Sequence, residues 1–141
     1  MDSAELEAKK RIVAFREAII REVLDALDQS LQSYRRGPDY PAFLRDALAE
    51  ALASLPGKEF IVEMDPEDVE LLRGEIERSD WEGAVQIEIK PTFDSNGGLR
   101  VTTRDRRLHY DNSFAARRQR TENDIRREIW SAIFGTHSSP H

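Results

Sequence analysis

Residues 94–135 read DSNGGLRVTTRDRRLHYDNSFAARRQRTENDIRREIWSAIFG, and this stretch predicts a β-hairpin that leads directly into one long helix. Apolar and polar residues alternate between Leu99 and Thr103, which is the pattern of a half-buried strand. A short connection at Asp105-Arg106 separates this run from a second alternating run. The stretch contains no nucleophile, metal cluster or phosphate loop, so it is typical of a docking module.

The return strand and the helix follow from the second half of this stretch. Leu108 and Tyr110 continue the apolar alternation, and residues 111–113 (Asp-Asn-Ser) carry side-chain oxygens that can cap a helix. Gly135 is predicted to end this helix. The apolar residues at helical spacing are Phe114, Ile125, Ile129, Trp130, Ile133 and Phe134.

The Asn96-Gly97-Gly98 sequence could suggest a phosphate-binding loop. Such a loop needs a following helix, whose N-terminal N–H groups bind the phosphate. Here a predicted strand follows instead, and no Gly-Lys-Ser/Thr sequence comes next. We therefore interpret these residues as the turn that positions the hairpin.

The chain has 141 residues, enough for one compact domain and an extended element, and no cysteine. The absence of cysteine excludes disulfides, thiolate metal sites and cysteine catalysis, and fits a reducing cytosol. No run approaches the roughly 18 apolar residues that a membrane span requires, and the polar N-terminus is not a signal peptide. The composition predicts a soluble protein without direct membrane insertion.

Charge is distributed unevenly along the chain. The formal net charge of −6 argues against non-specific nucleic-acid binding. Residues 56–96 carry 4 Lys or Arg against 12 Asp or Glu, whereas residues 97–141 carry 9 Arg against 5 Asp or Glu. This distribution suggests either pairing within the chain or a basic patch that faces an acidic partner.

Residues 3 to about 34 contain no Gly or Pro and predict one continuous helix. Residues 20–34 are most consistent with an ordinary core-facing helix. In the N-terminal part only Leu6 precedes Ile12 as a large apolar residue, so this part should fray unless the helix continues into, or pairs with, another segment. The apolar seam contains Val13, Ile20, Leu24, Leu27, Leu31 and Tyr34, and it is widened by Ile12, Phe15, Ile19 and Val23.

The middle of the chain predicts a second helix, then strand, helix and strand. Gly37-Pro38 breaks the first helix, and Asp65-Pro66 provides a cap and a first-turn proline for the third. The second helix begins near Pro41, and its apolar residues are Leu44, Leu48, Ala51, Leu52 and Leu55. The apolar residues of the third helix are Val69, Leu72 and Ile76. The strand before this helix contains Phe60-Ile61-Val62, and the strand after it contains Val85, Ile87 and Ile89.

These elements predict an α+β fold in the order α-α-β-α-β-β-β-α, with a small four-stranded mixed sheet, a crossover helix that makes the first two strands parallel, and a long C-terminal helix. The expected organisation is a long helix over 1–36, an α+β domain over 37–135 and a disordered tail over 136–141.

One pair of residues could perform acid–base chemistry. His109 and Asp111 share a strand face because they are two residues apart. Without a nucleophile or a pocket signature, a surface histidine is the favoured interpretation. We assign no catalytic residue, no cofactor and no metal ligand.

The last helix is rich in arginine, and three interpretations are open: a solvated face, a rim that recognises an acidic protein, and nucleic-acid binding. The first is favoured, because Glu122–Arg126 and Asp124–Arg127 have the spacing of helical ion pairs. Nucleic acid ranks last, because no aromatic residues for base stacking alternate with the arginines. The arginines are Arg117, Arg118, Arg120, Arg126 and Arg127.

Gly97-Gly98-Leu99, the charged hairpin, YDNSFAAR at 110–117 and IFG at 133–135 together resemble the carboxyl-terminal domain of the E subunit of rotary V-type/A-type ATPases. The resemblance covers about residues 4–135, with 97–118 as its most specific part. The chain starts partway along the family's long charged helix, as a shortened form or a short variant would. The turn at Asp105-Arg106 also lacks the glycine common in relatives.

The resemblance implies a non-enzymatic peripheral-stalk (stator) subunit, cytoplasmic and peripheral to the membrane, that tethers the catalytic head to the membrane sector. Its implied partners are a second helical stalk subunit and the head subunits. A related regulator of a flagellar or type III export ATPase is the alternative. A small hydrolase or other enzyme that uses His109 and Asp111 is a third hypothesis. The expected interface residues are Leu6, Ile12, Val13, Ile20 and Leu24 toward the partner helix, and Arg117, Arg118 and Arg120 toward the head.

Overall fold

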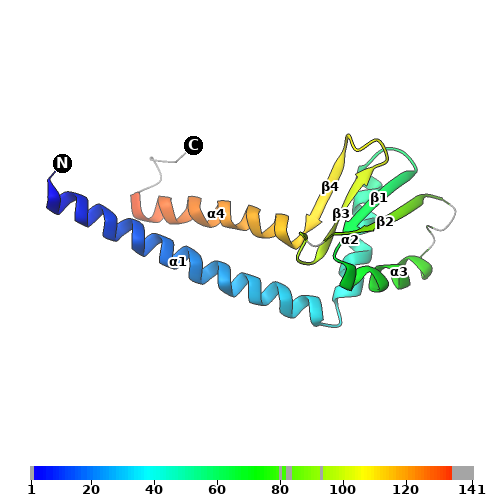
Figure 1. The fold of residues 1–141 in the computed structure, drawn as a ribbon, viewed down its shortest axis with the longest axis horizontal. Helices are drawn as coiled ribbons and strands as arrows, with labels where there is room; N and C mark the ends of the chain where they lie inside the picture. The colour runs from blue at the N-terminus through cyan, green and yellow to red at the C-terminus, as the bar shows by residue number, and fades with distance from the viewer. Residues whose placement is uncertain (1, 80, 82–83, 93, 135–141) are drawn as a thin grey trace. The chain divides into compact units, whose positions relative to one another are not determined.

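A computed structural model describes residues 2–79, 81, 84–92 and 94–134, and Figure 1 shows it as a ribbon. The chain divides into a helical unit (Met1–Ser30 with Arg118–His141) and a sheet unit (Leu31–Arg117). The elements in chain order are α1 (Ser3–Arg36), α2 (Tyr40–Ser54), β1 (Glu59–Met64), the 3₁₀ helix η1 (Pro66–Asp68), α3 (Val69–Glu77), β2 (Gln86–Pro91), β3 (Gly98–Thr103), β4 (His109–Ser113) and α4 (Phe114–Phe134).

The sheet has the strand order β2-β1-β3-β4. β1 and β2 run parallel, with Val62 beside Ile89, and α3 lies in the connection between them. β1–β3 and β3–β4 are antiparallel, and Val62 is also beside Val101. The predicted α+β fold, the parallel first pair and the order of the elements are therefore confirmed.

The core of the sheet unit lies between the sheet and α2, which crosses behind the strands in Figure 1. Pro41 occupies the first turn of α2, where its missing N–H costs nothing. Leu44 and Leu48 are completely buried, as the apolar spacing predicts. The sheet contributes the buried side chains of Phe60, Val62, Met64, Leu99 and Val101.

Tyr40 is a core residue that the apolar pattern did not identify. It is completely buried at the start of α2. Its ring packs edge-on against Phe114, at 5.8 Å between centroids, and stacks on Phe43 at 6.2 Å. Aromatic pairs at such separations add packing energy beyond their buried area. Tyr40 therefore joins the beginning of α2 to the beginning of α4.

Asp65 provides the cap that was predicted for the third helix. The Asp65 side chain accepts a hydrogen bond from the Glu67 backbone N–H at 3.0 Å, and Pro66 follows in the first turn. Residues 66–68, which follow this cap, form the 3₁₀ helix η1 instead of α-helix, and α3 begins at Val69. Val69 and Leu72 are the buried residues of α3.

The β3–β4 connection differs from the predicted short turn. Residues 104–108 form the loop between the two strands, and Leu108 is 49% exposed instead of continuing the apolar strand face. The reason is local: the Thr103 hydroxyl accepts from the Leu108 N–H at 3.2 Å, and Arg106 N–H donates to the Thr103 carbonyl at 2.8 Å. These bonds close the loop before β4 begins at His109.

The helical unit contains α1 as far as Ser30 and α4 from Arg118 onward, and these two helices run antiparallel and side by side in Figure 1. Ile20 and Leu24 of α1 are only 2% and 5% exposed. Polar contacts flank them, since Arg118 Nε lies 2.8 Å from Asp28 Oδ1 and Arg126 Nη1 lies 2.9 Å from Glu17 Oε1. The core-facing interpretation of this part of α1 is confirmed for Ile20 and Leu24.

Gly135 and residues 136–141, where the end of the last helix and a disordered tail were predicted, lie outside the described residues. Within the described part of the chain, none of the helices has a segment long and apolar enough to cross a membrane.

Candidate protein–protein interface

The apolar residues of α1 form two separate stripes. A helix advances by about 100° per residue, so residues three or four apart share a face. The first stripe contains Leu6, Val13, Ile20, Leu24, Leu27 and Leu31. The second, which we call the open stripe, contains Ile12, Phe15, Ile19 and Val23 and lies about a quarter turn around the helix from the first.

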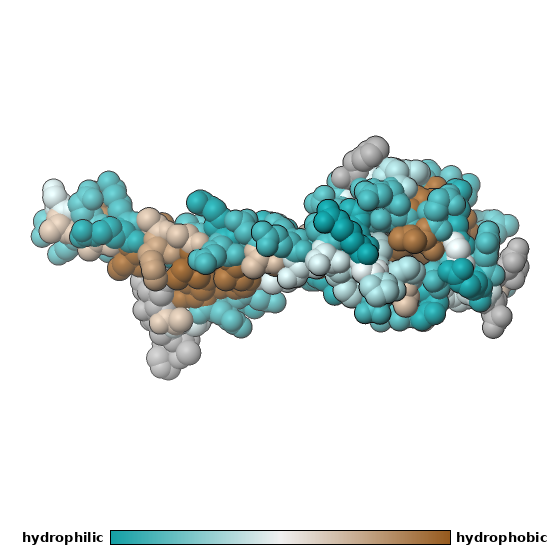
Figure 2. Space-filling model, turned by 90° about the horizontal axis from the view of Figure 1, so that it is seen from below, coloured by the Kyte–Doolittle hydropathy of each residue, from teal (hydrophilic) through white to brown (hydrophobic). Residues whose placement is uncertain are grey.

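The open stripe is exposed along most of its length. Phe15 is 64% exposed, and Ile12 and Val23 are each 41% exposed. Ile19 is half-buried. Figure 2 shows hydrophobic surface on the part of the molecule formed by the two long helices. Large apolar side chains repeated along one helix face are typical of a surface that another helix covers.

The structure separates the five residues expected to contact a partner helix. Leu6, Ile12 and Val13 are exposed, whereas Ile20 and Leu24 are buried within the helical unit. Ile20 and Leu24 therefore have little surface to offer to another chain. Phe15 and Val23 are exposed residues that the prediction had placed only at the margin of the seam, although their three- and four-residue spacing in the open stripe could have identified them.

The three arginines expected to contact the head lie in different environments. Arg117 donates to Asn112 Oδ1 at 2.9 Å, and its guanidinium lies 5.2 Å from the Phe43 ring centroid. Arg118 is half-buried and bonds Asp28. Arg120 is exposed. All three lie in the first two turns of α4, and all three have contacts within the chain.

Two further ion pairs within α4 agree with the sequence. Arg126 Nε lies 3.1 Å from Glu122 Oε2, and Arg127 Nη1 lies 3.5 Å from Asp124 Oδ1. Arg126 also reaches Glu17 on α1, and its hydrogen bond holds the pKa of the Glu17 carboxyl below its usual range. These predicted helical pairs are therefore confirmed.

A buried polar cluster within the sheet unit holds the last turn of α1. Arg35 Nε donates to both carboxylate oxygens of Asp68, at 3.1 and 3.0 Å. The Tyr40 hydroxyl donates to Asp68 Oδ2 at 2.7 Å and accepts from the Gly98 N–H at 2.8 Å. This cluster, the Arg35 anchor, joins α1, α2, η1 and β3, and the sequence patterns did not predict it.

The protonation states of this cluster follow from its surroundings. Burial raises the pKa of the Tyr40 hydroxyl well above its usual range, and the hydrogen bond to Asp68 raises it further. For Arg35, burial opposes the charged form, but the hydrogen bond to Asp68 and the nearby negative charges outweigh it, and the pKa of the guanidinium is raised. Arg35 is therefore a permanent cation paired with a buried carboxylate.

The turn before β3 needs both of its glycines. Gly97 and Gly98 have φ values of +120° and +69°, which side chains rarely adopt. A Cβ on Gly97 would lie 2.6 Å from the Phe114 ring, and one on Gly98 would overlap the Asn112 carbonyl. Phe114 N–H also donates to the Gly97 carbonyl at 2.8 Å. The predicted role of these residues as a turn is confirmed.

The acid–base hypothesis gains no support from the geometry. His109 is exposed. Asp111 Oδ1 accepts from the Ser113 N–H at 3.0 Å, and Ser113 Oγ in turn accepts from the Ala116 N–H at 3.2 Å as the cap of α4. Across the described residues, no group of three or more His, Cys, Asp or Glu could hold a metal ion.

Comparison with known proteins identifies the family. The family model described as ATP synthase (E/31 kDa) subunit matches residues 1–134. The A-type ATP synthase E subunit of Pyrococcus horikoshii is 34% identical over 133 residues, which is 94% of this chain and 67% of the relative. The A-type ATP synthase E subunit of Pyrococcus abyssi is 34% identical over 128 residues, covering 90% of this chain and 64% of the relative.

A more distant relative agrees with this assignment. One of the A-type ATP synthase E subunits of Methanospirillum hungatei is 27% identical over 132 residues, covering 94% of this chain and 65% of the relative. The chain thus spans about two thirds of the length of these curated relatives. The resemblance drawn from residues 97–118 is confirmed, and the chain belongs to the ATP synthase (E/31 kDa) subunit family.

Proposed function

We propose that this chain is a non-catalytic peripheral-stalk subunit of a rotary V/A-type ATPase or ATP synthase, which moves protons or sodium ions. In this role it tethers the static catalytic head to the membrane sector against torque. It works on the cytoplasmic side, peripheral to the membrane. Two observations support this proposal: the chain belongs to the ATP synthase (E/31 kDa) subunit family, and α1 is a continuous helix of 34 residues.

The open stripe of α1 is the observation that carries the proposal. Burying a Val, Ile or Phe side chain fully stabilises a complex by about 1.5–3 kcal/mol. Ile12, Phe15 and Val23, which are roughly half exposed, would together contribute about 2–4 kcal/mol on full burial. A second helical stalk subunit that lies along α1 would supply this burial. Leu6 and Val13, on the first stripe, add further exposed apolar surface in the N-terminal part of α1.

The Arg35 anchor suits a subunit that carries load. α1 has 34 residues and ends at Arg36, one residue after Arg35. A helix of that length extends about 50 Å. Because Arg35 pairs with a buried carboxylate, the last turn of α1 is fixed within the sheet unit. Tension or bending along the helix would therefore reach the folded sheet directly instead of fraying the end of the helix.

The sheet unit is proposed to bind the catalytic head. The contacts expected for Arg117, Arg118 and Arg120 remain part of this proposal. Arg117 and Arg120 are exposed, and Arg118 is half-buried. No cofactor is required for a tethering role.

Co-purification tests the proposal. The chain is co-expressed with the second stalk subunit and the head subunits of the rotary ATPase from the same organism, and each complex is isolated through a tag on this chain. We expect stoichiometric recovery of the stalk subunit and the head, and no ATP hydrolysis by the isolated chain. A monomer that ignores both partners would contradict the proposal. Selective recovery of a flagellar or type III export ATPase would favour the alternative.

A further inference from the structure

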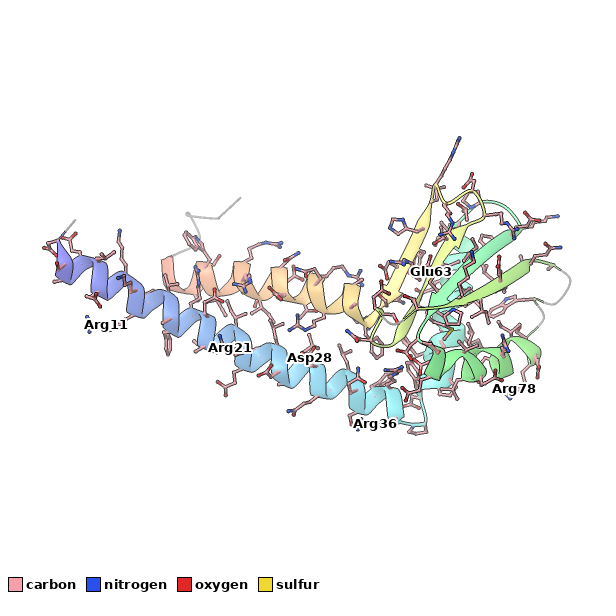
Figure 3. All side chains as sticks on the ribbon, in the orientation of Figure 1. Arg11, Arg21, Asp28, Arg36, Glu63 and Arg78 are labelled. Carbon is pink, nitrogen blue, oxygen red and sulfur yellow. The ribbon has the colours of Figure 1, made fainter. Side chains whose placement is uncertain are left out.

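The β3–β4 loop carries three exposed arginines. We call Arg104, Arg106 and Arg107 the basic loop. The side chains of Arg104 and Arg106 are 63% and 55% exposed, and Arg107 is exposed as well. Figure 3 shows side chains of this loop that extend beyond the end of the sheet.

The basic loop contrasts with the unit that carries it. Residues 31–117 contain 12 Lys or Arg and 17 Asp or Glu, a net charge of −5. Within the loop only Asp105 is acidic. The ion pairs that the structure describes for Arg104 and Arg106 are long, at 3.5 Å to Glu88 and 3.9 Å to Glu63. Exposed pairs at such distances neutralise little of the positive potential.

A groove lies beside the basic loop. It has a volume of about 750 Å³ and separates the loop from the turn between α2 and β1. Leu108 contributes an exposed apolar side chain to its wall, and Pro56 and Lys58 of that turn also line it. The charged side chains that line the groove are Lys58 and Arg104 together with Glu59 and Asp105. An apolar side chain surrounded by charged ones is a composition found at protein interfaces.

The basic loop is held in one conformation. Asp105 Oδ1 accepts from the Thr103 hydroxyl at 2.7 Å and from the Arg107 N–H at 3.0 Å. The hydrogen bond from the Thr103 hydroxyl lowers the pKa of the Asp105 carboxyl most, and the bond from the Arg107 N–H lowers it further, so that this pKa lies below its usual range. Because the loop is ordered before binding, a partner would lose less conformational entropy on docking.

Arg106 occupies a conformation that disfavours a side chain. Its φ is +62°, in the left-handed region where glycine is free of strain. The ion pair described for Arg106, a long contact to Glu63, does not explain why an arginine occupies this position. A charged residue kept in a strained and exposed position is an observation that points to function.

We infer that the basic loop and its groove bind an acidic surface on a subunit of the catalytic head. This inference rests on the proposed function, and it places the main contact at the end of the hairpin instead of on α4, where Arg117 and Arg118 already serve contacts within the chain. The partner surface presents carboxylates to the arginines and an apolar side chain to Leu108. Association is steered electrostatically and weakens with salt.

Binding of the purified head to the immobilised complex of this chain and its stalk partner tests the inference. The test variant carries Arg104→Glu, Arg106→Glu and Arg107→Glu. The matched control carries Arg36→Glu, Arg73→Glu and Lys90→Glu, three exposed cations elsewhere in the sheet unit, and so has the same net charge. We expect roughly 30-fold weaker binding for the loop variant, mainly through slower association, and a change within about threefold for the control.

A second variant separates binding from folding. Arg106→Gly removes the charge and relieves the left-handed strain, so its thermal stability should equal or exceed that of the wild type. Its affinity for the head should nevertheless fall roughly threefold. Loss of stability together with loss of binding would contradict this separation and overturn the role given to Arg106.

The outcomes distinguish the two proposals. If the wild type does not bind the head, the proposed function fails together with this inference. If the wild type, the loop variant and the control all bind equally, only the inference fails. A short DNA duplex that competes with the head for the wild type, and that the loop variant no longer binds, would overturn the assignment to a protein surface.

Discussion

Arg35 Nε contacts both carboxylate oxygens of Asp68, 33 residues further along the chain, at 3.1 and 3.0 Å. Asp68 is 3% exposed. This contact ties the last turn of α1 to the segment that leads into α3. A buried ion pair of this kind adds little net stability compared with apolar packing, but removal of one partner leaves the other charge buried and unpaired.

Arg35→Ala should therefore destabilise the fold by about 3 kcal/mol. Arg36→Ala provides the matched control, because Arg36 is its exposed neighbour in the same turn, and it should change stability by no more than about 0.5 kcal/mol. Urea unfolding followed by circular dichroism measures both. Equal effects of the two substitutions would show that the Arg35 anchor contributes nothing specific.

The glycines provide a second test of stability. Gly98→Ala should destabilise by more than about 3 kcal/mol, because the new Cβ meets the backbone of Asn112 and Ser113 in addition to the left-handed strain. Gly57→Ala is the control: its φ is +96° and nothing lies within 4 Å of the added Cβ. It should cost only the strain, about 1–2 kcal/mol. Similar losses for the two variants would contradict the close approach at Gly98.

Because the Tyr40 hydroxyl is buried, the free energy of unfolding should depend on pH in the alkaline range. The folded-state pKa of Tyr40 is raised above its unfolded value of about 10, so its contribution is complete below that pH and is lost as pH rises through the folded pKa. The difference in ultraviolet tyrosinate absorbance between the wild type and Tyr40→Phe should appear only as the protein unfolds. A titration of Tyr40 near pH 10 in the folded protein would refute its buried hydrogen bonding.

The two stripes of α1 should respond differently to truncation. Ile20→Ala should destabilise the isolated chain by about 2–4 kcal/mol, since it creates a cavity at a position that is 2% exposed. Ile12→Ala, at an exposed position on the open stripe, should change stability by about 0.5 kcal/mol or less. Thermal unfolding measures both. Equal shifts in the unfolding midpoint would contradict the burial of Ile20 and the exposure of Ile12.

The order of elements could be predicted because it rests on local signals. Gly37-Pro38 and Asp65-Pro66 punctuate the chain, and the strand at 98–103 alternates with a period of two. The parallel pairing of β1 and β2 followed from the helix between them. Such features depend on residues that are close together in the chain, so they can be recognised from a single sequence.

The remainder depends on contacts between distant segments. Arg35, Tyr40 and Asp68 are individually ordinary residues, and only the fold shows that they meet around one carboxylate. Both α1 stripes are apolar, so the sequence could not tell which of their residues the chain itself buries. The sequence therefore grouped Ile20 and Leu24 with the expected partner contacts, although packing within the chain leaves Phe15 and Val23 exposed.

The affinity of the second stalk subunit for the open stripe tests the central claim most directly. Phe15→Ala/Val23→Ala removes apolar surface that the isolated chain leaves exposed, and should weaken the complex about 100-fold. Leu71→Ala is the control, because Leu71 is 40% exposed on α3, close to the 41% of Val23. It should bind within about threefold of the wild type. Titration calorimetry that finds the same affinity for all three proteins would contradict the account.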